Sequence, residues 1–138
     1  MNSRALSIAL ALSAISGAAS AQQLNLYCSV QIEWCQALVT NFQRDTGVRV
    51  NMTQKGSGEV FAQIRAEAQN PRGDVWFGGT GDPHLAAAEE GLSQEYESKA
   101  LADLTPWAKG QYEASKKRTV GIYAGAAGFG FKIGRAHV

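Results

Sequence analysis

The sequence has no marked excess of charge of either sign. It holds 13 lysines and arginines against 12 aspartates and glutamates. Arg4 and Arg135 lie in terminal segments that we leave out of the fold, and without them 11 basic residues remain, a net charge near −1. This balance gives no electrostatic reason to expect nucleic acid or an anionic membrane surface as a partner.

Long apolar runs are also lacking once the first 21 residues are set aside. In this leader, Arg4 supplies a basic start, residues 5–15 are apolar, and Ala19, Ser20 and Ala21 form a small-residue cleavage pattern. The apolar run is shorter than the roughly 20 residues that a membrane-spanning helix needs. We therefore expect residues 1–21 to be a signal peptide and the mature protein to be soluble in the periplasm.

The carboxyl end carries a second segment that we exclude from the fold. Residues 133–138, IGRAHV, are the in-frame translation of a widely used sequencing adaptor, and the adaptor's preceding bases fit the codon of Lys132. We expect genuine protein to end near Phe131 and regard residues 132–138 as an artefact. Glycines at 125, 128 and 130 suggest a hinge, so residues 22–131 would be one lobe, truncated near the hinge of a larger protein.

Cysteine is scarce, with only Cys28 and Cys35 present. An exported chain folds in an oxidising compartment, which favours a disulfide between them. The C-x6-C spacing differs from the C-x-x-C spacing of redox-active pairs. Two inert thiols remain the alternative.

Signatures of catalysis are absent as well. Ser57 lies in KGSGE, where the glycines are one residue too close for a G-x-S-x-G nucleophile elbow, and neither glycine loop matches a phosphate-binding or dinucleotide-binding motif. His84 is expected in the first turn of a helix, where the dipole disfavours its protonation, so we interpret it as a capping or surface residue. We expect no catalytic residue, metal site or cofactor; the alternative is an exported hydrolase that uses Ser57 or Asp82.

What the sequence does contain is an alternation of strand and helix patterns. Strands are predicted at 24–27, 48–52, 74–77 and 119–123. Helices are predicted at 32–46, 57–69, 83–90 and 107–116, with a weaker helical region at 96–104. Short connections between them imply right-handed crossovers and a parallel sheet covered on both faces, a three-layer α/β/α architecture.

Apolar spacing and capping residues add detail to this prediction. Trp34, Leu38 and Phe42 recur every four residues and, with Cys35 and Val39 beside them on the same face, predict the buried stripe of the first helix. Trp76 and Phe77 are also expected in the core. Ser57 is predicted to cap the second helix. Asp82 is predicted to cap the third, with Pro83 at its first position.

Three loops follow predicted parallel strands and therefore lie at one edge of the sheet, each before a helix start. Helix-start N–H groups and hydroxyls at such an edge favour a polar or anionic small ligand. The sequence therefore predicts a small-molecule cleft at this edge. The residues that we expect to bind the ligand are Ser29, Gln31, Ser57, Gly58, Gly79, Thr80 and Tyr123.

Six segments stand out in order along the chain: LYCS at 26–29, DTGV at 45–48, KGSGE at 55–59, AQIRAE at 62–67, DVWFGGT at 74–80 and LAAAEEGL at 85–92. Together they resemble the amino-terminal lobe of extracellular solute-binding proteins of ABC importers, in particular the ferric-iron type. The resemblance implies a two-lobed type II periplasmic-binding fold that closes on its ligand and delivers it to a permease, and we expect the full-length protein to be a monomer.

The resemblance also bears on the ligand. Iron-binding members place a histidine near the end of the first strand and a glutamate after the third, and the matching positions here are Gln31 and Gly79. An amide and a glycine are poor ligands for a hard metal ion. Helix-start amides with Ser57 and Thr80 suit a phosphate, phosphonate or carboxylate group instead. We expect an anionic organic solute rather than ferric iron, with iron as the alternative.

Overall fold

The computed structural model describes residues 23–125. The predicted signal peptide, the glycines at 128 and 130 and the adaptor-like residues lie outside this range. No helix within it is long and apolar enough to cross a membrane. The elements are β1 (Gln23–Cys28), α1 (Ile32–Thr46), β2 (Arg49–Gln54), α2 (Ser57–Ala66), β3 (Val75–Phe77), α3 (Gly81–Glu89), the 3-10 turn η1 (Leu101–Asp103) and α4 (Pro106–Ala114).

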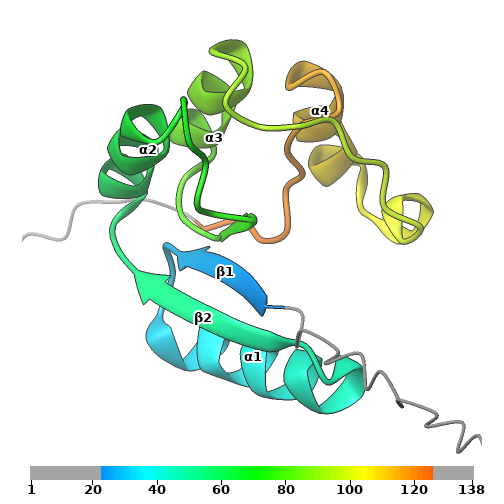
Figure 1. The fold of residues 1–138 in the computed structure, drawn as a ribbon. Coiled ribbons are helices and arrows are strands. Elements are labelled where there is room, and N and C mark those ends of the chain that lie inside the picture. Colours follow the sequence, from blue (N-terminus) through cyan, green and yellow to red (C-terminus); the bar gives the residue numbers. More distant parts are fainter. Residues whose placement is uncertain (1–22, 126–138) are drawn as a thin grey trace, which may run out of the picture.

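Three parallel strands form the sheet, in the order β2–β1–β3. β1 is central, because Leu26 pairs with Met52 of β2 on one side and with Val75 of β3 on the other. Figure 1 shows α1 against one face of the sheet and α2 and α3 on the other face. The predicted α/β class, a parallel sheet between layers of helices, is therefore confirmed.

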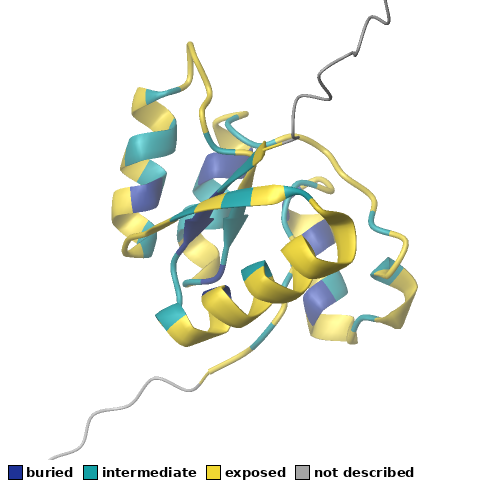
Figure 2. Ribbon diagram, turned by 60° about the horizontal axis from the view of Figure 1, so that its bottom comes forward, coloured by how far each residue is buried: buried dark blue, intermediate teal, exposed yellow. Residues whose placement is uncertain are grey.

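The buried core follows the central strand. Leu26, Tyr27 and Cys28 are consecutive and all buried, as expected for a strand paired on both edges and covered on both faces. Val60 of α2 is fully buried, and small alanines of α3 and α4 supply other buried positions. Figure 2 shows short buried stretches on helices that are otherwise intermediate or exposed.

A polar network ties Tyr27 of β1 to α2. Its hydroxyl donates a hydrogen bond of 2.7 Å to Glu67 Oε2 and accepts one of 3.0 Å from Gln63 Nε2. Burial, followed by the hydrogen bond to the Glu67 carboxylate, raises the pKa of Tyr27. The ring leaves no room at Gly73, where a Cβ atom would lie 2.4 Å from Tyr27 Cε2. Gly73 is therefore required by packing against the central strand.

The predicted buried stripe of α1 is wrong at Trp34, Leu38 and Phe42 and right at Cys35, while Val39 is half-buried. Trp34, Leu38 and Phe42 are 51%, 47% and 40% exposed, whereas Cys35 is fully buried. Successive residues of a helix are about 100° apart, so the face centred on Cys35 is distinct from the face centred on Leu38. The disulfide from Cys35 to β1 fixes which of the two faces the sheet. Trp76 and Phe77 are half-buried, so their predicted place in the core holds only in part.

Both predicted helix caps are wrong by one or two residues. The N-cap of α2 is Gly56, whose N–H donates a hydrogen bond of 2.9 Å to Glu59 Oε2, and the N-cap of α3 is Thr80. Ser57 begins its helix and does not cap it, because its hydroxyl is used elsewhere, as the acceptor of the Thr80 N–H. Asp82 and Pro83 are the second and third residues of α3.

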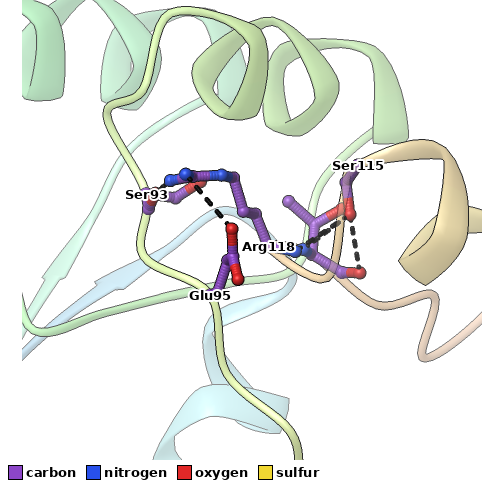
Figure 3. A network of polar contacts seen from close by, with 5 residues as sticks. Ser93, Glu95, Ser115 and Arg118 are labelled. Carbon is purple, nitrogen blue, oxygen red and sulfur yellow. Dashed lines mark hydrogen bonds and ion pairs between the residues drawn. The ribbon is translucent and has the colours of Figure 1, made fainter.

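Residues 119–123 do not form the predicted strand. No described strand pairs with the outer edge of β3 or with this segment, so no ladder supports it. The segment is held by contacts at its start instead, which Figure 3 shows. The Ser115 hydroxyl accepts hydrogen bonds of 3.2 Å and 2.9 Å from the N–H groups of Arg118 and Thr119, and the Arg118 guanidinium donates to the Ser93 carbonyl. Within the region 96–104, where the sequence weakly predicts a helix, the structure contains only the 3-10 turn η1.

Candidate ligand-binding site

The carboxyl ends of the three strands lie at one edge of the sheet. From β1 the chain passes through α1 to β2 on one side, and then through α2 to β3 on the opposite side of β1. The loops after β1 and β3 therefore leave the sheet in opposite directions, which makes the point between them a topological switch. Open α/β sheets bind ligands at such a point.

Close contacts show that the three loops converge. A Cβ atom built on Gly79 would lie 2.1 Å from Ser57 Oγ and 3.0 Å from Ser29 Cβ. The Thr80 N–H donates a hydrogen bond of 3.2 Å to Ser57 Oγ. Gly79 has a φ of +91°, a conformation that L side chains rarely adopt. Four of the predicted residues thus meet at one place, and a side chain at Gly79 would fill it.

Tyr123 joins this cluster from the far end of the described chain. Its hydroxyl accepts a hydrogen bond of 2.7 Å from the Gly79 N–H and donates one of 3.1 Å to the Gly79 carbonyl. Its ring meets Trp34 edge to face, with centroids 5.7 Å apart. We call Ser29, Ser57, Gly79, Thr80 and Tyr123 the hydroxyl cluster.

The two other predicted residues, Gln31 and Gly58, are less closely tied to this cluster. Gln31 is the exposed N-cap residue of α1, and no side-chain hydrogen bond of Gln31 occurs within residues 23–125. Gly58 is exposed in the first turn of α2, where an added Cβ would meet nothing within 4 Å. Neither of them contacts Gly79 or Tyr123 through a hydrogen bond described for this part of the chain.

The interpretation of His84 as a capping or surface residue is wrong. Its ring is half-buried and stacks on Trp76, with centroids 3.7 Å apart and an interplanar angle of 26°. His84 Nε2 lies 2.8 Å from the Gly78 carbonyl oxygen, which can only accept, so this nitrogen carries the proton. Burial lowers the pKa of His84, and the bond to Gly78 offsets part of that effect. The neutral imidazole therefore stabilises the turn at Gly78 and Gly79 through its hydrogen bond to the Gly78 carbonyl.

Trp76 links His84 to the loop after β1. Its indole Nε1 donates a hydrogen bond of 2.8 Å to Ser29 Oγ. The ring stack with His84 thus connects α3 to the loop after β1. The sequence marks Trp76 only as an apolar strand residue, and no local pattern signals its contact with Ser29, which is 47 positions away.

A disulfide fixes the same loop from the other side. Cys28 at the end of β1 and Cys35 in the first turn of α1 are joined, with their Cα atoms 6.4 Å apart. Both residues are fully buried. The loop that carries Ser29 and Gln31 is therefore closed covalently, and its course is restricted.

Within residues 23–125, no base is hydrogen-bonded to Ser57 that could activate it as a nucleophile. Ser57 Oγ accepts the Thr80 N–H, and His84 is directed to the Gly78 carbonyl, so neither contacts the other through a described hydrogen bond. Asp82 is exposed in α3. Within residues 23–125, no three or more histidine, cysteine, aspartate or glutamate side chains gather closely enough to hold a metal ion.

A hollow of about 990 Å³ adjoins the cluster. Its lining includes Val75 of β3 and Arg118. Gly79 and Tyr123 belong to both the lining and the hydroxyl cluster. A volume of this size accommodates a small organic molecule.

Residues 24–128 match the family described as bacterial extracellular solute-binding proteins. The chain belongs to this family. The resemblance seen in the sequence is therefore confirmed at the level of the family. The comparison covers nearly every element described above, including the three loops that converge at the sheet edge.

Solved structures of periplasmic binding proteins are similar to this chain. The periplasmic binding protein P5PA is 38% identical, with a TM-score of 0.65 over 70% of this chain. AfuA from Actinobacillus pleuropneumoniae, solved with exogenous fructose-6-phosphate bound, is 38% identical, with a TM-score of 0.61 over 63% of this chain. Iron-bound HitA from Pseudomonas aeruginosa is 30% identical, with a TM-score of 0.58 over 63% of this chain.

The chain spans only part of these proteins. The matches cover 31% of P5PA, 27% of AfuA and 28% of HitA. Each of the three proteins is therefore more than three times as long as the region that matches.

Proposed function

We propose that the chain is the amino-terminal lobe of a periplasmic solute-binding protein that captures an anionic organic solute for an ABC permease. The observation that carries the proposal is the convergence of three strand-end loops on Gly79. There, hydroxyls of Ser29 and Ser57 and the N–H groups before α3 lie together. These groups are hydrogen-bond partners for phosphate or hydroxyl oxygens.

The choice of an organic anion rests on which groups meet at the cluster. Gly79 and Gln31 offer no carboxylate or imidazole to a hard metal ion. The similarity to AfuA, whose structure holds fructose-6-phosphate, supports the same choice. The proposal also includes delivery to a permease, a second lobe in the full-length protein and a monomeric state, and membership of the family supports these parts.

Titration of the 138-residue chain, expressed in an oxidising compartment, with fructose 6-phosphate tests the proposal. Amide resonances of Ser29, Ser57, Gly79 and Thr80 should shift saturably in nuclear magnetic resonance spectra. Glu113, on the exposed side of α4, should not shift. The absence of any saturable shift at this edge of the sheet would contradict the proposal.

A variant pair tests the location of the site. Gly79→Ala should weaken binding roughly tenfold or more, because its Cβ would enter the space of Ser57 Oγ and displace at least one hydrogen-bond partner. Gly110→Ala is the matched control, since an added Cβ there meets nothing within 4 Å and the residue lies in α4. A thermal melt of each variant separates lost binding from lost folding. Equal affinity in the two folded variants would move the site elsewhere.

Ferric iron is the second candidate, because iron-bound HitA is also similar to the chain. Equilibrium dialysis against ferric citrate measures it directly. Binding of iron in preference to fructose 6-phosphate would reverse the order of the two candidates.

The hydrolase alternative makes a different prediction. A hydrolase using Ser57 or Asp82 would release inorganic phosphate from fructose 6-phosphate, and Ser57→Ala or Asp82→Ala would abolish the release. We expect no turnover, since no described base contacts Ser57. Turnover that is lost in either variant would replace the binding function with an enzymatic one.

A further inference from the structure

The donors that the proposed ligand needs are already occupied by hydroxyls of the protein. The Gly79 N–H donates to the Tyr123 hydroxyl at 2.7 Å, and the Thr80 N–H donates to Ser57 Oγ at 3.2 Å. A backbone N–H has one proton to donate. A ligand oxygen that binds Gly79 must therefore first displace the hydroxyl of Tyr123.

The Tyr123 hydroxyl uses both of its hydrogen-bonding functions on one residue. It accepts from the Gly79 N–H and donates to the Gly79 carbonyl at 3.1 Å. An alcohol hydroxyl or a singly protonated phosphate oxygen satisfies the same pair of groups. An oxygen that only accepts would leave the Gly79 carbonyl unsatisfied and facing another negative atom.

The segment that carries Tyr123 is anchored at Thr119, which is hydrogen-bonded to Ser115, and has few hydrogen bonds beyond that residue. Residues 119–123 pair with no described strand, and Gly121 makes one long backbone hydrogen bond, 3.4 Å to the Ala108 carbonyl. The Tyr123 ring has a second contact in Trp34, which does not involve the hydroxyl. If the hydrogen bonds to Gly79 were lost, the Tyr123 ring would therefore still have its packing contact with Trp34.

From these contacts we propose that the Tyr123 hydroxyl is a placeholder: it occupies the position of a ligand hydroxyl or protonated phosphate oxygen on Gly79 and leaves when the ligand binds. This inference rests on the proposed function. In this proposal the Tyr123 hydroxyl competes with the ligand for Gly79, whereas the sequence predicts that Tyr123 binds the ligand. The two roles predict opposite effects of removing the hydroxyl.

Tyr123→Phe removes the hydroxyl and keeps the ring against Trp34. A hydrogen bond that no longer has to be broken contributes roughly three- to tenfold in affinity, so Tyr123→Phe should bind fructose 6-phosphate tighter by that factor. Tyr112→Phe is the matched control, because Tyr112 lies outside the lining of the hollow and its hydroxyl has no hydrogen-bond partner within residues 23–125, and its affinity should equal that of the wild type. Affinity that falls or stays unchanged in Tyr123→Phe would overturn the placeholder and leave the proposed function intact.

The wild-type chain supplies a second measurement that does not depend on the folding of a variant. With ¹³C at tyrosine Cζ, the Tyr123 signal should change as fructose 6-phosphate saturates the Gly79 amide shift, because its hydroxyl changes partners. A Tyr123 signal that stays constant at saturation would overturn the inference. No saturable binding by wild type, Tyr112→Phe or Tyr123→Phe would instead overturn the proposed function, and the placeholder with it.

Discussion

Removal of the disulfide between Cys28 and Cys35 should destabilise the chain by a predictable amount. The bridge closes a loop with a sequence separation of 7 residues. Loop-closure entropy for a loop of this length corresponds to about 2.4 kcal/mol of the free energy of unfolding at 25 °C. For a domain of about 100 residues this equals a fall in Tm of roughly 10–20 °C.

Urea unfolding with and without reductant measures the effect. With an m-value of about 1–2 kcal/mol/M, reduction should lower the urea midpoint by roughly 1–2 M without changing m. The burial of both sulfur atoms adds to the loss, because two separate thiols need more room than a bridge in a site that is fully buried. The entropic figure is therefore a lower bound.

The double variant Cys28→Ala/Cys35→Ala is the control for the reductant itself. Its midpoint should be unaffected by reductant and should lie near that of the reduced wild type. A shift below about 0.3 M on reduction of the wild type would refute the reasoning, since loop closure alone predicts several times that value.

Three further predictions concern groups that support the site and the core. The pKa of His84 is lowered in the folded chain, so the unfolded chain binds more protons, and the free energy of unfolding should fall between pH 7.5 and 5.5; His84→Phe should flatten this dependence in urea titrations. Gly73→Ala should cost about 1–3 kcal/mol, because its Cβ would lie 2.4 Å from the Tyr27 ring, whereas Gly58→Ala should cost nothing in the same thermal melts. Tyr27→Phe should cost about 1–3 kcal/mol at pH 7, since the Glu67 carboxylate loses a donor, and the cost should shrink in a series of melts at falling pH once the pH passes below the lowered pKa of Glu67.

Elements with strong local patterns were predictable from the sequence. β1, β2 and β3 follow from short apolar runs between glycines and polar turns, and α1 ends at Gly47, whose φ of +72° is the left-handed conformation that glycine favours. The parallel order of the strands followed from the helices between them. The convergence of the three loops was predictable for the same reason, because parallel strands end at one edge of a sheet.

Details that depend on distant contacts were not predictable. In α1 the sequence places Cys35 beside Trp34, Leu38 and Phe42, but the bridge to β1 accompanies burial of Cys35 alone and the other three stay largely exposed. The half-burial of His84 depends on Trp76, and the Tyr123 hydroxyl reaches Gly79 across 44 positions. Periodicity and capping rules describe neighbours along the chain and contain no information about such partners.

The same long-range contacts change what the candidate site means. The sequence predicts loops with open N–H groups, as if the ligand met free donors. In the structure the donors of Gly79 and Thr80 already have hydroxyl partners, so binding is an exchange of one hydrogen-bond partner for another. The net gain from such an exchange is small unless the ligand also meets groups outside this lobe. A second lobe would supply them, and weak binding by this chain alone is therefore what the hydroxyl cluster itself predicts.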